Sequence, residues 1–184
     1  MGSPRHYRLY LESGPRHKTT MVHVLDLLGC IAQGTTTPEA IAATPQAIQG
    51  YLMFLRRHGE AVPGEDEAIS VVSAEHVTKG FWVGRGSPSI IFQLDLDTIT
   101  SNEMARYLRW LDWARDDLVG LVKGLGPEGL DAPCPGARTL REVLEHLWQA
   151  EQWYVKNLGP GRGQDGARTS WKSWRQCGRS PATA

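Results

Sequence analysis

This sequence has few cysteines, no formal net charge and no long apolar runs. Its 20 basic residues balance 20 acidic ones, so the formal net charge of +0 gives no electrostatic case for a nucleic-acid partner, and none is expected. The three cysteines, Cys30, Cys134 and Cys177, are odd in number and far apart, which favours a reducing, cytoplasmic location over a disulfide framework. No apolar run approaches membrane-spanning length, so no membrane association is expected.

The sequence also lacks a complete catalytic or metal-binding motif. A zinc site needs three or four convergent donors, and His146 is a single donor, because no histidine follows it. Glu142 and Glu145 beside it fit a helix cap and a solvated surface better than general acid–base catalysis. Cys30 fits a buried small hydrophobe better than a reactive thiol, because no histidine adjoins it.

Apolar alternation predicts strands in the first part of the chain. Residues 6–12 alternate with a period of two, and the β-branched run at residues 19–25 follows a turn rich in glycine and proline. These two segments are expected to pair antiparallel. Gly29 then turns the chain into a short third strand at residues 30–33, and the apolar run at residues 69–72 predicts a fourth.

A basic cluster surrounds the first of these turns in the sequence. Tyrosines are interleaved with it, as in surfaces that contact RNA. A solvated strand face is the favoured interpretation, and RNA contact the alternative. The cluster comprises Arg5, Arg8, Arg16, His17 and Lys18, with Tyr7 and Tyr10 between them.

One amphipathic helix follows the third strand. Thr37 is expected to be its N-cap, with Pro38 in the first turn and Glu39 complementing the helix dipole. Pro45 predicts a break, because an internal proline removes a hydrogen bond, so a short piece and a main piece over residues 45–58 are expected. The face expected to cover the sheet comprises Ile48, Tyr51, Leu52 and Leu55.

The composition changes after the fourth strand. Residues 77–99 contain several glycines and are interpreted as a linker that packs through Phe81, Trp82 and Phe92. Capping boxes at Thr100–Glu103 and Thr139–Glu142 then predict two helices, over about residues 101–123 and 140–158. Residues 159–184 lose the apolar period and are expected to be disordered. The apolar stripe expected on the first helix comprises Met104, Leu108, Leu111, Leu118 and Val122, and that on the second comprises Val143, Leu144, Leu147, Trp153 and Tyr154.

A set of short motifs runs through residues 5–76. They are Leu27-Leu28-Gly29-Cys30, Gln33-Gly34-Thr35, Pro38-Glu39-Ala40-Ile41, Ala47-Ile48, Tyr51-Leu52 and His58-Gly59-Glu60. Through these motifs residues 5–76 resemble the HicB-like antitoxin domain, over roughly the first two fifths of the chain, with departures from the family at Leu28 and Pro45. The resemblance implies a small β-β-β-α-β module, a partial ribonuclease H-like fold, whose members are not nucleases, so Asp26 and Glu39 are interpreted as structural.

The second predicted helix contains two informative segments, residues 138–147 and Ala150-Glu151-Gln152-Trp153-Tyr154. Through them residues 100–158 resemble half of a DinB-like four-helix bundle. In that family a histidine at the position of His146 is one of three metal ligands, and a later His-x-x-x-His pair supplies the other two. This chain has no such pair, so zinc or nickel is expected only if the site is completed from elsewhere.

Two functions follow from these resemblances. The first is a non-enzymatic α+β interaction protein that binds a small, toxin-like protein partner and forms a homodimer through its helical hairpin. The aromatic residues of that hairpin, Trp110, Trp113, Trp148 and Trp153, are expected in a core or an interface. The alternative is a DinB-like metal-dependent hydrolase or thiol transferase that uses His146, with its site incomplete in this chain.

Overall fold

The computed structural model describes residues 5–64 and 67–157, and it has the α+β architecture that the sequence predicts. The chain divides into two compact units, unit 1 (Met1–Trp110) and unit 2 (Leu111–Ala184). The described part of unit 1 contains four strands and one long helix in the expected β-β-β-α-β order, and the start of a second helix. The expected helix end at Leu158 and the expected disordered tail lie outside the described residues.

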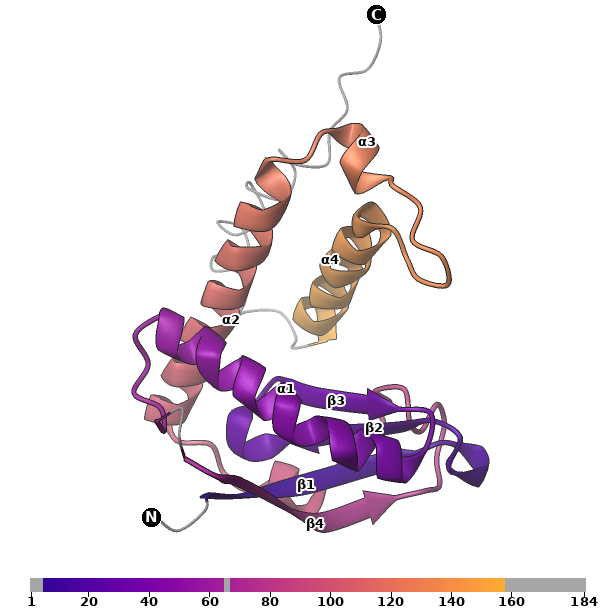
Figure 1. The fold of residues 1–184 in the computed structure, drawn as a ribbon, viewed down its shortest axis with the longest axis vertical. Coiled ribbons are helices and arrows are strands. Elements are labelled where there is room, and N and C mark those ends of the chain that lie inside the picture. The colour runs from indigo at the N-terminus through magenta and orange to yellow at the C-terminus, as the bar shows by residue number, and fades with distance from the viewer. Residues whose placement is uncertain (1–4, 65–66, 158–184) are drawn as a thin grey trace, which may run out of the picture. The chain divides into compact units, whose positions relative to one another are not determined.

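The four strands form one sheet in the order β3-β2-β1-β4 (Figure 1). β1 pairs antiparallel with β2, as expected, β2 pairs antiparallel with β3, and β4 lies parallel to β1. The fourth strand is five residues longer than the predicted run at 69–72, because its pairing with β1 continues past a register shift between Leu9 and Tyr10. The strands are β1 (Arg5–Ser13), β2 (Thr20–Val24), β3 (Cys30–Gly34) and β4 (Ile69–Val77).

Other segments of unit 1 pack against both faces of the sheet. Leu9 and Leu11 of β1 are buried on the face that helix α1 (Thr37–Arg57) crosses (Figure 1). On α1, Ile48, Leu52 and Leu55 are buried, which confirms the predicted face of the helix. On the opposite face, the rings of Tyr10 and His23 each lie 5.5 Å from the ring of Phe92. The buried residues of β2 and β3 are Thr20, Met21, Val22, Val24, Cys30 and Ala32.

Two details of α1 differ from the prediction. The N-cap is Thr36, whose side chain accepts a hydrogen bond from the backbone N–H of Glu39 at 3.3 Å. Thr37 does not serve as the cap, because its hydroxyl is hydrogen-bonded to the sheet at Ser13 and Thr20. The helix also runs without a break through Pro45.

Burial on both sides of Pro45 explains the continuous helix. Ala40, Thr44 and Ile48 lie four residues apart on one face and are fully buried. A proline inside a helix costs about 3 kcal/mol, and the burial of these three side chains on one continuous face offsets that cost. The Thr44 hydroxyl also donates to the Ala40 carbonyl at 2.9 Å, one turn before the proline. Tertiary packing therefore overrides the local helix-breaking signal.

The segment after β4 packs on the second face of the sheet. It includes a short helical turn, η3 (Gln93–Leu96), whose first N–H, that of Gln93, donates to the Glu75 carboxylate at 2.9 Å. Phe92 is buried, as the sequence analysis expects, and so is Val83. Phe81 and Trp82 are 70% and 67% exposed, so the expectation that they pack inward is wrong. The sequence could not show which aromatic side chains of this glycine-rich segment face inward, because the segment has no regular apolar period.

The second helix, α2 (Ser101–Lys123), begins in unit 1 and continues into unit 2. Within unit 1, the buried ring of Trp110 packs edge-on against Tyr51 of α1, with ring centroids 6.1 Å apart. Of the predicted stripe, Met104, Leu108 and Leu111 are exposed, Leu118 is partly exposed and Val122 is buried. The periodicity therefore identified a buried position near the end of α2, whereas in its first half the aromatic residue Trp110 is the one that packs inward.

Unit 2 also contains the short helix α3 (Pro127–Leu130) and α4 (Leu140–Asn157). Both predicted capping boxes are present, since Thr100 and Glu103 exchange hydrogen bonds at the start of α2, as do Thr139 and Glu142 at the start of α4. Arg115 of α2 donates from two nitrogens to Glu151 of α4, at 3.0 and 2.7 Å. Among the described helices, none has the length and apolar character that a membrane crossing requires.

Candidate functional site

A buried carboxylate joins the sheet to the loop at residues 79–87, here called the aromatic loop. Glu12 of β1 is fully buried. Its Oε2 accepts from the backbone N–H groups of Gly84 at 2.9 Å and Ser87 at 3.3 Å, and its Oε1 accepts from Gly86 at 2.9 Å. Nε2 of His23 lies 3.0 Å from the same Oε1. A buried charge is tolerated only when it is fully bonded in this way.

Glycine at position 84 is required by this arrangement. A Cβ on Gly84 would lie 2.3 Å from the Thr19 carbonyl oxygen and 2.6 Å from the Gly14 nitrogen, and the residue has a φ of +85°. Gly86 has a φ of +75°. The sequence analysis interpreted the glycines here as part of a linker, and nothing in the sequence identified Glu12, more than 70 residues away, as the acceptor.

A second polar cluster lies at the same end of the sheet. The hydroxyl of Ser13 is 2.7 Å from Nε2 of His76, 2.7 Å from the Thr20 hydroxyl and 3.1 Å from the Thr37 hydroxyl. A serine bonded to a histidine has the geometry of a nucleophile and its base, but Ser13 is fully buried beneath α1. We therefore assign the cluster a structural role, joining β1, β2, β4 and the start of α1.

The surface above these two clusters carries exposed aromatic and basic side chains. Phe81 and Trp82 stack on each other, with centroids 5.3 Å apart and ring planes 13° from parallel. The turn η1 (Pro15–His17) between β1 and β2 contacts the aromatic loop, because a Cβ on Gly14 would lie 3.0 Å from the Val83 carbonyl. Exposed Arg16 lies on η1, and exposed Arg85 lies on the loop.

The structure divides the basic cluster noted in the sequence. Arg8 donates to Asp26 at 2.7 Å, which gives Asp26 a structural partner. Arg5 lies over the Tyr7 ring at 5.8 Å, at the opposite end of β1 from η1. Tyr7 and Tyr10 are buried and belong to the core. The remaining members, Arg16, His17 and Lys18, are exposed together beside the aromatic loop.

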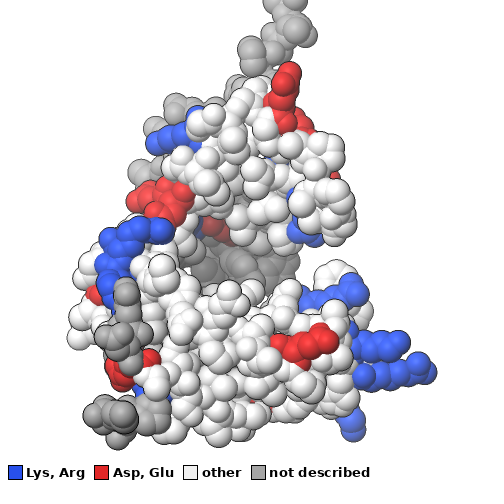
Figure 2. Space-filling view, viewed as in Figure 1, with Lys and Arg blue, Asp and Glu red and all other residues white. Residues whose placement is uncertain are grey.

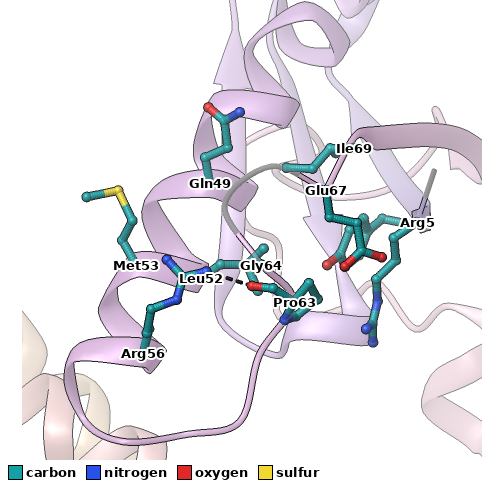
Figure 3. A pocket seen from close by; sticks show the side chains of 10 residues that line it. Arg5, Gln49, Leu52, Met53, Arg56, Pro63, Gly64, Glu67 and Ile69 are labelled. Atoms are coloured by element: carbon teal, nitrogen blue, oxygen red, sulfur yellow. Dashed lines mark hydrogen bonds between the residues drawn. The ribbon is translucent and has the colours of Figure 1, made fainter. Parts of the chain in front are cut away.

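A small cavity of about 180 Å³ lies between the end of α1 and the edge of the sheet (Figure 3). Gln49, Met53 and Arg56 line it from α1, and the Arg56 guanidinium donates to the Pro63 carbonyl at 2.6 Å. Arg5 and Glu67 add charged groups to its wall. Residues 65 and 66 fall between the lining residues Gly64 and Glu67 and lie outside the described part of the chain, so we assign no ligand to the cavity.

The other candidate residues in unit 1 have structural environments. Cys30 is buried, and burial raises the pKa of its thiol to about 12, so it is protonated at neutral pH. Burial also raises the pKa of Tyr51 to about 12, and its hydroxyl donates to the Leu28 carbonyl at 2.6 Å. The carboxylate of Glu39 accepts hydrogen bonds from the Thr35 hydroxyl and N–H, which lower its pKa.

In unit 2, His146 is exposed on α4. Glu142 caps that helix, as expected, and Glu145 is exposed. Within residues 5–64 and 67–157, no group of three or more histidine, cysteine or acidic side chains has a geometry that could hold a metal ion. Trp148 and Trp153 are exposed on α4, whereas Trp110 is buried in unit 1.

One comparison with known proteins gives a match. Over 52 residues, the chain is 38% identical to the UPF0150 protein Ta0767 of Thermoplasma acidophilum, and the match covers 75% of that protein. The chain belongs to the UPF0150 family. UPF0150 proteins are HicB-like, which agrees with the resemblance of residues 5–76. The match covers 28% of this chain, and no family model and no solved structure matches it.

Proposed function

We propose that this protein is a non-enzymatic interaction module of the HicB antitoxin type, in which unit 1 binds a small, toxin-like protein. Membership of the UPF0150 family is the observation that carries the proposal. The β-β-β-α-β order of unit 1 agrees with it, and a partial ribonuclease H-like fold is part of the same proposal. A cytoplasmic location would place the protein with such a partner.

The polar groups of unit 1 fit a binding role better than catalysis. The carboxylate of Glu12 and the hydroxyl of Ser13, which have the chemistry of a catalytic acid and nucleophile, are fully buried and used in internal hydrogen bonds. Cys30 is buried with a raised pKa. A reacting group must reach its substrate, and these three groups instead stabilise the scaffold beneath the surface.

We further propose that the α2–α4 region, half of a DinB-like bundle in this interpretation, mediates homodimerisation. Leu147, Trp148 and Trp153 expose apolar surface on α4, and no described side chain of α4 is buried. A pair of helices has little core of its own, whereas two pairs related by a twofold axis supply the four helices of a bundle. A second copy of this chain is therefore the proposed occupant of that surface.

A coexpression experiment tests the antitoxin proposal. The small open reading frame next to this gene is induced alone, together with this chain, or together with the same transcript carrying an early stop codon. Growth arrest by the neighbour alone, relief only by the intact chain, and a stable complex of the two purified proteins are the expected results. A neighbour that is not toxic, or relief that survives the stop codon, would contradict the proposal.

Metal analysis of the same purified protein addresses the enzymatic alternative. Two copies of His146 in a dimer would still be fewer than the three or four ligands of a usual zinc site. We expect no stoichiometric zinc or nickel. One tightly held metal per chain that is lost in His146→Ala would contradict the non-enzymatic proposal.

A further inference from the structure

From the aromatic loop and the neighbouring turn η1, we infer a second binding surface on unit 1, one that takes single-stranded nucleic acid. The surface consists of the stacked pair Phe81 and Trp82 and the cations around it. It differs from the protein-binding role proposed above, and it does not depend on that role. The argument rests on the rings, on the charge beside them and on how the scaffold fixes the loop.

The ring pair is presented to solvent instead of being packed. Phe81 is 70% exposed and Trp82 67%, although both belong to residue types that dominate protein cores. Their planes lie within 13° of each other. Two exposed and nearly parallel rings form a stack that an unpaired base can extend, and such stacking tolerates any base, because every base has a π-face.

The backbone holds this pair at a local cost in free energy. Trp82 has a φ of +57°, a left-handed conformation that is strained for a residue with a side chain. Among the described residues, the other non-glycine residues with positive φ are Arg16 and His17, on the turn that contacts the loop. Such strain persists only where the surrounding structure enforces it, and it is concentrated at functional sites.

The buried carboxylate of Glu12 holds the loop in this conformation. Its three hydrogen bonds from Gly84, Gly86 and Ser87 fix the loop immediately after the rings. The Ser87 hydroxyl donates to the Phe81 carbonyl at 2.6 Å, which closes the loop across the ring pair. The rings are therefore preorganised, and binding a strand to them incurs little ordering cost.

Positive charge flanks the rings from two segments. Lys79 and Arg85 are exposed on the loop, and Arg16 and Lys18 are exposed on or beside η1. The register places these segments together, because Glu12, near the end of β1, pairs with Val77, at the end of β4. Figure 2 shows Lys and Arg side chains gathered at one end of the sheet unit (Figure 2).

The carboxylates at this end are fewer than the cations. Glu12, Glu39 and Glu75 keep their negative charges while they accept hydrogen bonds, and the four cations Lys79, Arg85, Arg16 and Lys18 outnumber them. The balanced charge of the whole chain thus conceals a local excess of basic groups, and phosphate contacts depend on the local excess.

The composition of the loop favours nucleic acid over a protein partner. Within residues 79–87, the apolar side chain other than the two rings is Val83, and it is buried. Protein-binding hot spots are enclosed by groups that exclude water, whereas these rings are surrounded by glycines and cations. Aromatic platforms bordered by Arg and Lys are typical of single-strand binding.

Fluorescence anisotropy with the full chain tests the inference. The probes are a labelled 12-nucleotide RNA of mixed sequence, DNA of the same sequence, and the RNA duplex. The single strands are expected to bind more tightly than the duplex. Equal binding of RNA and DNA indicates recognition of stacking and phosphate alone, and a preference for RNA adds contact with the 2′-hydroxyl; both results support the surface.

The main variant is Trp82→Gly, because glycine removes the ring and suits a φ of +57° without strain. Affinity for the single strands is expected to fall at least about fivefold, and Phe81→Ala is expected to act similarly. Arg85→Gln should lower the slope of log affinity against log salt by about 0.7, the value for one phosphate contact on a single strand. Met53→Ala, which shortens an exposed apolar side chain of α1 away from the loop, is the control and should have no effect.

Three results would overturn the inference. The first is no binding of either single strand at about 100 µM, the weak end of the usual range for non-specific binding. The second is equal loss of affinity in Trp82→Gly and Met53→Ala. The third is a Trp82→Gly variant that keeps its oligonucleotide affinity but loses the toxin-like protein, since the rings would then be a protein-docking site.

Discussion

In unit 1 other segments pack against both faces of the sheet, α1 on one and residues 81–96 on the other, whereas in unit 2 no described side chain of α4 is buried. The two regions have helices of similar amphipathic character. They differ in what their apolar faces contact within the chain. Helix α1 of unit 1 buries Ile48, Leu52 and Leu55, whereas α4 of unit 2 leaves Leu147, Trp148 and Trp153 exposed. An interaction role for unit 2 follows from that contrast.

The largest expected effect comes from shortening one buried and one exposed leucine. Leu55→Ala removes a fully buried side chain of α1 and should lower the free energy of unfolding by about 2–5 kcal/mol. Leu147→Ala, at a side chain that is 38% exposed on α4, should change it by less than about 0.5 kcal/mol in dilute protein. Urea denaturation measures both. Equal losses would remove the contrast between the units.

The thiols of Cys30 and Cys134 offer a second comparison of the units. Cys30 is buried in unit 1 with a pKa of about 12, and Cys134 is exposed in unit 2. At neutral pH a thiol reagent should modify Cys30 roughly a hundredfold more slowly than Cys134, since only the thiolate reacts and the site must open first. Peptide mapping over time gives the two rates. Similar rates in the native protein would contradict the burial of Cys30.

A smaller loss is expected at the buried carboxylate. Glu12→Gln replaces one acceptor oxygen with an amide that donates, which leaves a backbone N–H of the aromatic loop without its partner. The expected loss is about 1–3 kcal/mol for one unsatisfied buried donor. Glu75→Gln is the matched control, since Glu75 accepts one exposed hydrogen bond from Gln93. A loss at Glu12 no larger than that at Glu75 would mean that the loop is not held by this charge.

The smallest expected effect is a pH dependence from His76. Burial first, and His17 second, lower the pKa of His76 below its ordinary value of 6.5. The unfolded chain therefore binds a proton more readily, so this contribution to stability is present above pH 6.5 and is lost as the pH falls through the lowered pKa. Between pH 7 and pH 5, the Tm should fall less in His76→Gln than in the unsubstituted protein. Identical pH profiles would show that His76 makes no contribution.

The sequence predicted the parts of the fold that depend on local periodicity. Alternation located β1, β2 and β3, the spacing of Ile48, Leu52 and Leu55 identified the buried face of α1, and the capping boxes located α2 and α4. These signals are local, and tertiary contacts do not override them at these positions.

The candidate site could not be predicted in the same way. Glu12 resembles an ordinary polar residue of an alternating strand, and its partners are more than 70 residues away in a loop without a period. Pro45 and Thr37 were misinterpreted for a related reason, because burial at Thr44 and hydrogen bonds from Ser13 and Thr20 override the local preference. Contacts between distant segments determine all three positions.

The mass of the full chain in solution tests the central claim most directly, that unit 2 covers its apolar face with a second copy. Light scattering is expected to give about twice the chain mass of 20.4 kDa. Leu147→Glu on α4 should reduce the mass to that of one chain, whereas Met53→Glu, at an exposed apolar residue of α1, should leave it unchanged. A protein that is monomeric at all concentrations and binds no hydrophobic dye would contradict the account.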